Sequence, residues 1–314
     1  MAWRTKAFAV VLKAISSENT PETMPTARAK RAALVESRAG RLVFGTDHPG
    51  TTLTERSIEL GGFTSRLRIH TPTARTWDPL PIVVNYHGGG WTQGAPEQSR
   101  WIASRVAVGV GAIVVSPTYR LAPEHPYPAA VDDAWTILEW VAAYASELGG
   151  DPTRIAVMGD SAGGNLAAVT ALKAREAGIP KLRCQVLIYP GVEMYDRWPS
   201  EDENAEAPVL TSVGMRTFAH MYMAELYGTE DWQASPIRAA SHADLPPALI
   251  ITAGHDPLRD NGTRYADAMR GDGSLAELRN HPDAIHGFVS LPGMVPAAKR
   301  AREEIVRFLT DHLA

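Results

Sequence analysis

The turn at residues 159–163 constrains the fold of this chain more than any other stretch. Residues 155–158 before it are apolar and typical of a buried strand, the turn itself reads Gly-Asp-Ser-Ala-Gly, and a helical pattern follows at once. A sharp strand-to-helix turn crowds the residues around its serine, so glycine is required on both sides. We therefore expect the Ser161 hydroxyl to stand above the end of a sheet, where it could act as a nucleophile.

Further apolar runs resemble that strand and alternate with helical patterns. The expected strands lie at 56–60, 64–70, 82–86, 112–116, 184–189, 248–252 and 276–279, and the expected helices at about 129–148, 166–178, 261–270 and 297–313. This alternation predicts an α/β fold with a mostly parallel central sheet and helices on both faces. A chain of 314 residues can form a single domain of this class.

Two segments break the alternation of strands and helices. Residues 1–50 are helical or irregular, and Pro21 and Pro25 are expected to interrupt the helix. Within this segment, residues 1–14 predict an amphipathic helix, because their apolar run is shorter than that of a secretory signal; a cleaved signal is the minor alternative. Residues 191–235 are rich in Glu, Asp, Trp and Met and are interpreted as an insertion over the sheet.

Composition narrows the partners and the compartment. The net charge of −4, from 31 basic and 35 acidic residues, gives no reason to expect nucleic acid. No stretch approaches the roughly 20 apolar residues of a membrane span. The single cysteine, Cys184, precludes an internal disulfide and fits a reducing compartment, so a cytoplasmic location is expected. No histidine or cysteine cluster has metal-ligand spacing, so no metal is expected.

A nucleophilic serine needs a base to take its proton and an acid to orient that base. In open α/β sheets with such a turn, the base lies in the loop after the last strand. His286 is placed there, and Gly287 beside it would let the loop pack closely. His281, earlier in the same region, is the rival base. His255 adjoins the candidate acid in sequence, so that acid could not easily orient it.

The acid is expected in the loop after a late strand. Asp256 fits, because it follows the strand predicted at 248–252. Asp260 and Asp283 are the rivals, but Asp260 is expected to cap the following helix and Asp283 lies close in sequence to the base. Asp160, inside the turn, is expected to brace it. The serine, acid and base would then meet at the carboxyl edge of the sheet.

An oxyanion that forms during acyl transfer needs N–H donors. The Ala162 N–H, directly after the serine, is one candidate. A glycine run after an early strand supplies the others, because glycines let the backbone approach a substrate oxygen. Gly89 and Gly90 are the expected donors and Gly88 is a further candidate, while His87 is expected to hydrogen-bond the loop.

Five motifs, taken in their order along the chain, are similar to those of a known family. They are His-Gly-Gly-Gly-Trp, Tyr-Arg-Leu-Ala-Pro-Glu, Gly-Asp-Ser-Ala-Gly-Gly, Asp-Pro-Leu-Arg-Asp and His-Gly-Phe, at residues 87–91, 119–124, 159–164, 256–260 and 286–288. The ordered set resembles the hormone-sensitive-lipase-like carboxylesterases of the α/β-hydrolase superfamily. The likeness extends from about residue 55 to the end of the chain.

This resemblance implies an α/β-hydrolase fold with a helical cap in one domain, residues 1–314. The cap would comprise about residues 1–50 and 191–235, and the catalytic core residues 51–190 and 236–314. The segment that contains Tyr119 and Glu124 resembles the one that braces the glycine loop in the family.

The resemblance also implies a reaction. Ser161, Asp256 and His286 match the family triad, and the glycine loop with Ala162 matches its oxyanion hole. The expected substrates are small esters of short or medium acyl chains, and no cofactor is expected. The same triad cleaves amides, peptides and lactones, and some relatives have become small-molecule receptors, so both alternatives stay open at this point. An edge strand of the sheet could also pair two subunits into a homodimer.

Overall fold

The central sheet has the predicted, mostly parallel arrangement. The computed structural model describes residues 20–75 and 77–314, and within them eight strands form one sheet in the order β1-β2-β4-β3-β5-β6-β7-β8. Strand β2 pairs antiparallel with β1 and β4, and the other neighbouring strands run parallel. The strands are β1 Thr51–Leu60, β2 Phe63–Pro72, β3 Leu80–Tyr86, β4 Ile113–Pro117, β5 Gly150–Asp160, β6 Leu182–Ile188, β7 Ala248–His255 and β8 Ala276–Ile285.

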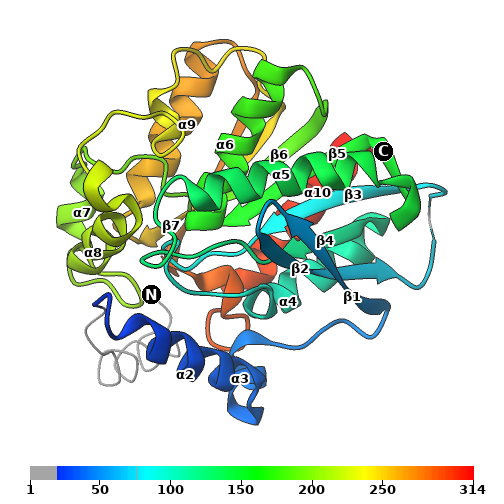
Figure 1. Ribbon diagram of the computed structural model, residues 1–314, viewed down its shortest axis with the longest axis horizontal. Helices are drawn as coiled ribbons and strands as arrows, with labels where there is room; N and C mark the ends of the chain where they lie inside the picture. Colours follow the sequence, from blue (N-terminus) through cyan, green and yellow to red (C-terminus); the bar gives the residue numbers. More distant parts are fainter. Residues whose placement is uncertain (1–19, 76) are drawn as a thin grey trace.

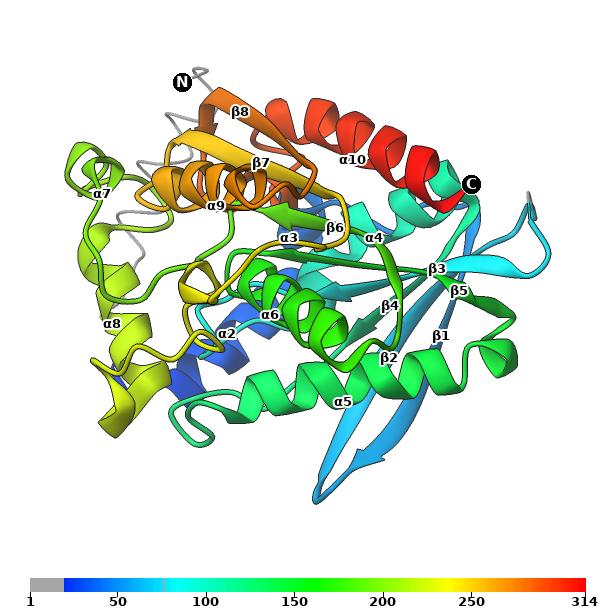
Figure 2. The same ribbon diagram turned by 90° about the horizontal axis from the view of Figure 1, so that it is seen from above.

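Helices cover both faces of the sheet. Helices α5, α6 and α9 lie on one face, and α4 and α10 lie on the other (Figures 1 and 2). The helices are α2 Met24–Glu36, α3 Arg38–Phe44, α4 Arg100–Val106, α5 Ala129–Ala143, α6 Ala162–Ala177, α7 Pro199–Glu203, α8 Ser212–Met223, α9 Arg259–Gly271 and α10 Ala297–Leu313. Short helical turns are η1 Pro96–Ser99, η2 Ala107–Gly111, η3 Ser146–Leu148, η4 Ala224–Leu226, η5 Pro236–Arg238 and η6 Phe288–Ser290.

Each face of the sheet has its own apolar core, because successive strand residues point to opposite faces. In β3, Ile82 and Val84 belong to the core that contains α5 and α6, whereas Val83 belongs to the core that contains α4 and α10. A parallel strand covered on both faces therefore needs apolar side chains at nearly every position. This requirement explains the continuous apolar runs from which the sheet was predicted.

The segment before β1 differs from the prediction at one proline. Helix α2 begins at Met24 and includes Pro25, where the sequence predicted an interruption. Proline is tolerated in the first turn, because the N–H it lacks would have no intrahelical acceptor there. Val35 and Phe44 then anchor α2 and α3 in the core that contains α10. The amphipathic helix predicted for residues 1–14 lies outside the described residues.

Strands β7 and β8 extend beyond their predicted ends. They continue to His255 and Ile285, and these two residues pair with each other across a β-bulge. Asp256 and His286 therefore each follow directly on the last residue of a strand. Two neighbouring parallel strands thus deliver an acid and a base to the same edge of the sheet.

The segment predicted as an insertion, residues 191–235, contains α7 and α8 and lies at one end of the molecule (Figure 1). Its two ends are tied to the helix that follows the serine turn. The side-chain amide of Asn165 donates to the carbonyl oxygens of Gly191 at 2.9 Å and Ala234 at 2.8 Å. The division of the chain into a cap and a core stays a prediction.

Candidate active site

The serine turn is a strained junction between β5 and α6. Ser161 has φ 56° and ψ −118°, a conformation rare for residues with a side chain. A Cβ atom at Gly159 would lie 2.1 Å from the Gly163 oxygen, and one at Gly163 would lie 2.1 Å from the Tyr86 oxygen. Both flanking glycines are therefore required by close backbone contacts, as the sequence predicted, and the serine is held above the end of the sheet.

The predicted serine, base and acid are brought together in one hydrogen-bonded chain. His286 Nε2 lies 2.9 Å from Ser161 Oγ, and His286 Nδ1 lies 2.7 Å from Asp256 Oδ2. These three residues follow the carboxyl ends of β5, β7 and β8. Because Nδ1–H donates to the carboxylate, Nε2 is left as an acceptor for the serine hydroxyl. The arrangement can remove a proton from Ser161.

The acid is fixed from several sides. Asp256 is fully buried, and its Oδ1 accepts the Leu258 N–H at 2.8 Å, which leaves Oδ2 for the histidine. The Asn204 side chain, just after α7, donates to the Asp256 carbonyl oxygen at 3.3 Å. On the other side, the Tyr189 ring lies 4.9 Å from the imidazole of His286. The inserted segment therefore helps to hold the loop that carries the acid.

The rival residues have other partners or positions. His281 Nε2 lies 2.9 Å from Glu304 Oε2, in β8 facing α10. Asp260 does not cap α9, because the N-cap position is Leu258; its Oδ2 accepts the Ser200 N–H at 2.9 Å instead. The helix begins earlier than predicted, so Asp260 lies inside its first turn. The positive end of the helix dipole stabilises an acidic side chain at that position.

The glycine loop is joined to the serine turn through Asp160. The Gly88 N–H donates to Asp160 Oδ1 at 2.9 Å, so this N–H is already used and the candidate donors narrow to Gly89, Gly90 and Ala162. Burial raises the pKa of Asp160 to about 6, although the bond from Gly88 lowers it. The predicted bracing of the turn thus takes the form of a direct bond between two loops.

His87 and Tyr119 support the glycine loop from beneath. Their rings stack at 4.3 Å, and the Tyr119 hydroxyl donates to the His87 carbonyl oxygen at 2.6 Å. His87 Nδ1 lies 2.9 Å from the Gly88 oxygen, which also accepts from the Gln98 amide at 3.0 Å. Burial lowers the pKa of His87 to about 4, so the imidazole is neutral near pH 7 and donates through Nδ1.

The N–H groups of Gly89 and Gly90 have no acceptor among the described residues. Both glycines have positive φ, 130° and 61°. A Cβ atom at Gly89 would lie 2.0 Å from the Gln93 oxygen, and one at Gly90 would lie 2.6 Å from the Phe218 ring of α8. The Ala162 N–H is the first of helix α6, where N–H groups also lack intrahelical acceptors.

Comparison with known proteins identifies the family. A model of the α/β-hydrolase fold matches residues 83–290. The chain belongs to the α/β-hydrolase family. It is 46% identical to Carboxylesterase NlhH and 42% identical to Esterase LipI, both of Mycobacterium tuberculosis, over 81% of this chain and 80% of each relative. The structure of a thermostable esterase from Pseudomonas putida superposes with a TM-score of 0.90 at 34% identity, covering 100% of this chain and 98% of that one.

The predicted resemblance to hormone-sensitive-lipase-like carboxylesterases and the predicted fold class are both confirmed by these comparisons. Sequence reasoning missed Arg28 of α2, however. Its guanidinium pairs with Glu124 at 2.7 Å, and its Nε donates to the Thr92 oxygen at 2.6 Å. Glu124 thus braces the loop through an arginine of the N-terminal segment. The motif contains the glutamate but carries no sign of its partner, which lies far away in sequence.

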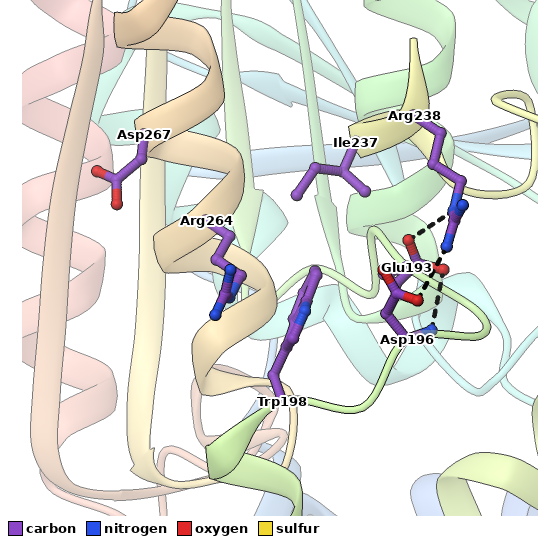
Figure 3. Close-up of a pocket in the computed structure, with 7 residues that line it drawn as sticks. All are labelled: Glu193, Asp196, Trp198, Ile237, Arg238, Arg264 and Asp267. Atoms are coloured by element: carbon purple, nitrogen blue, oxygen red, sulfur yellow. Dashed lines mark hydrogen bonds and ion pairs between the residues drawn. The ribbon is translucent and has the colours of Figure 1, made fainter.

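A pocket of about 410 Å³ in this hydrolase lies apart from these residues (Figure 3). Glu193 and Arg238 form an ion pair at 2.8 Å beside it, and Arg264 lies 5.0 Å above the Trp198 ring. None of the predicted site residues lines the pocket. It is lined by Glu193, Asp196, Trp198, Ile237, Arg238, Arg264 and Asp267.

Other candidate chemistry of this hydrolase is limited. Burial raises the pKa of Cys184 in β6 to about 12, which keeps the thiol protonated and inert as a nucleophile. In residues 20–75 and 77–314, no group of three or more His, Cys, Asp or Glu side chains is arranged to hold a metal ion. Among the described helices, none combines the length and apolar character needed to cross a bilayer.

Proposed function

We propose that this hydrolase cleaves carboxylic esters through a covalent acyl-enzyme, with Ser161 as nucleophile, His286 as general base and Asp256 as the residue that orients it. The observation that carries this proposal is the continuous chain of hydrogen bonds from the Asp256 carboxylate to the Ser161 hydroxyl. The family and its carboxylesterase relatives support the reaction class.

In the first half of the reaction, Ser161 Oγ attacks the acyl carbon while His286 Nε2 takes its proton. The Asp256 carboxylate stabilises the imidazolium that forms. When the tetrahedral intermediate collapses, the carbon–oxygen bond to the alcohol breaks and the imidazolium returns the proton to the leaving oxygen. In the second half, the histidine deprotonates a water molecule that attacks the acyl carbon. The bond from that carbon to Ser161 Oγ then breaks, the imidazolium returns the proton to Oγ, and the carboxylic acid product is released.

The negative charge that develops on the carbonyl oxygen needs donors in place before the reaction. We assign this role to the N–H groups of Gly89, Gly90 and Ala162. Gly88 serves a different purpose, since its N–H holds the loop against Asp160. We expect the predicted cap to determine which alcohol and acyl groups are accepted. Esters of short or medium acyl chains remain the expected substrates. The cytoplasmic location and the homodimer also stay predictions.

The decisive test combines hydrolysis and labelling. Rates of p-nitrophenyl ester hydrolysis are measured across acyl lengths for the wild type and Ser161→Ala, and the active serine is labelled with a fluorophosphonate. We expect hydrolysis and labelling in the wild type and loss of both in the variant, with kcat lowered by roughly 10⁴-fold or more. Retention of most activity in Ser161→Ala would show that another group is the nucleophile.

A matched pair of substrates separates the ester hydrolase from its alternative. An anilide and an ester of the same acid are compared by kcat/KM. We expect the ester to be preferred, whereas preference for the anilide would assign the triad to amide cleavage. A receptor without catalysis would neither react with the fluorophosphonate nor hydrolyse either compound.

A further inference from the structure

Helix α2 presents two arginines to the glycine loop. Arg28 binds the Thr92 oxygen and Glu124, so one face of the helix meets the segment that follows the glycines. Residues three apart in a helix share a face. Arg31 therefore lies one turn further along the same face, beside the loop that carries the candidate oxyanion donors.

Arg31 has no hydrogen-bond or ion-pair partner among the described residues. Its Nε atom is buried and makes no hydrogen bond, and no carboxylate is paired with its guanidinium. The side chain as a whole is only partly exposed. Three carboxylates near α2 are each paired with a different arginine: Glu36 with Arg100, Glu97 with Arg66 and Glu124 with Arg28.

The charge of Arg31 acts on the residues that support the site. Burial is the main cause that lowers the pKa of His87, and the charge of Arg31 adds to it. Burial raises the pKa of Asp160, and the same charge opposes that rise. Burial lowers the pKa of Arg31 and the charge of Asp160 opposes that fall, so the two groups attract each other, but no hydrogen bond or ion pair joins them. A guanidinium without a hydrogen-bonded carboxylate thus lies close to the serine turn.

We propose that Arg31 binds a carboxylate of the substrate and makes esters with an anionic group the preferred substrates of this hydrolase. The inference rests on the proposed ester hydrolysis and extends it to a substrate class. A desolvated cation without a partner is costly, and the planar guanidinium fits a carboxylate through two parallel N–H bonds. A substrate carboxylate would supply the hydrogen-bonded anion that the described chain does not, and the chemistry at Ser161 would be unchanged.

Two matched pairs of esters test this proposal and locate the carboxylate. Monoethyl adipate and ethyl hexanoate differ in a charge on the acyl part, and 4-acetoxybenzoate and 4-acetoxybenzamide differ in a charge on the alcohol part. In at least one pair, Arg31→Gln is expected to lower the ratio of charged to neutral kcat/KM by roughly 10- to 100-fold, mainly through KM. The neutral ester should change little, and Arg31→Lys should retain part of the preference. An unchanged ratio in both pairs overturns the proposal.

Binding of adipate gives a readout that does not depend on turnover. Calorimetry is expected to give a Kd at least roughly tenfold weaker in Arg31→Gln than in the wild type. Equal binding in the two proteins counts against the proposal. If the wild type cleaves none of the four esters, the proposed function fails, and adipate binding still decides the role of Arg31.

Two control variants address charge in general and the first residues of the chain. Lys30 is exposed on the same helix, so Lys30→Gln removes an equal charge and should leave the ratio unchanged. Residues 1–19 contain a single carboxylate, Glu18. If Glu18→Gln strengthens the preference for the charged ester, Arg31 has a partner within its own chain and the proposal is wrong. An unchanged ratio in Glu18→Gln supports it.

Discussion

At the scale of single residues, the two oxygens of Asp256 have separate tasks. Oδ1 accepts the Leu258 N–H and Oδ2 accepts from His286. In Asp256→Asn, the amide oxygen is expected to stay with Leu258, which turns the NH₂ group toward the histidine. Nδ1 must then accept, so the proton moves to Nε2, which can no longer take one from Ser161. We expect kcat to fall roughly 10³- to 10⁴-fold with little change in KM.

Steady-state kinetics with a p-nitrophenyl ester check this prediction, with thermal unfolding to confirm the fold. Asp260→Asn is the matched control. Asp260 lies nearby in the first turn of α9, and the amide oxygen of the variant can still accept from the Ser200 N–H. The control should keep kcat within about threefold, as for a substitution outside the reacting groups. A mild effect in Asp256→Asn would mean that the histidine is oriented by something else.

Asp160 makes the stability of the protein depend on pH. Its folded pKa is about 6, against an ordinary 3.8, because burial disfavours the charge. The unfolded chain therefore releases this proton first, and the contribution of Asp160 to stability, fully present below pH 3.8, is lost as pH rises through 6. Asp160→Asn keeps an acceptor for Gly88 but cannot ionise. It should become more stable relative to the wild type by up to about 3 kcal/mol between pH 4 and pH 8.

The measurement is the free energy of unfolding in denaturant at both pH values, for the wild type and the variant. Other groups titrate in both proteins, so their contributions cancel in the difference between them. A difference that stays constant with pH would show that Asp160 is ionised in the folded protein without cost.

The sequence predicted the serine, acid and base because each lies at a strand end, with few competing residues. It could not predict Arg28 or Arg31, because a run of charged residues on a helix is typical of a solvent-exposed face. The roles of the two arginines depend on where α2 packs, and no local sequence pattern predicts that contact. The sequence also predicted Gly88 as a candidate oxyanion donor for a similar reason. Only the folded structure shows that its N–H donates to Asp160.

At the scale of elements, the glycine loop is confined by helix α8. A Cβ atom at Gly90 would lie 2.6 Å from the Phe218 ring, and the φ of 61° is itself unfavourable for alanine. Gly90→Ala should therefore displace the loop from the serine turn and lower kcat by roughly 10- to 100-fold. Adding Phe218→Ala removes the clash and should restore part of the rate.

A glycine in an open turn provides the control for backbone strain. Gly61 has a φ of 54° and nothing within 4 Å of its virtual Cβ. Gly61→Ala should cost about 1 kcal/mol of stability and leave kcat unchanged. Steady-state kinetics and denaturant unfolding compare the variants. Equal loss of kcat in Gly90→Ala with and without Phe218→Ala would contradict the proposed contact.

The ends of the helices and strands were harder to predict than their presence. The strands of the sheet were predicted because burial on both faces makes them apolar throughout. The ends of β7 and β8 were missed because their last residues pair through the backbone, as Ala253 does with His281. Backbone pairing leaves no hydrophobic pattern in the sequence. The boundary of α2 was missed for a related reason, since Pro25 can begin a helix as well as end one.

At the scale of the whole molecule, the N-terminal helices are held to the sheet by a few polar contacts and the anchors Val35 and Phe44. The Arg28–Glu124 pair is one of them, but its two members are unequal. The Glu124 side chain is 44% exposed, and its carboxylate pairs with the arginine and accepts from its own backbone N–H, whereas Arg28 also donates to the carbonyl oxygens of Thr92 at 2.6 Å and Ala122 at 2.5 Å.

This asymmetry predicts that the two partners differ in their effect on the N-terminal segment. Glu124→Gln loses an exposed ion pair and should cost less than about 1 kcal/mol. Arg28→Met also leaves two carbonyl oxygens without donors, and should cost about 2–3 kcal/mol for detachment of α2. Hydrogen exchange resolved along the chain measures this opening. Exchange should accelerate in residues 24–44 of Arg28→Met, while the strands at the centre of the sheet stay protected. Equal acceleration in both variants would mean that the ion pair, and not the backbone contacts, holds α2 in place.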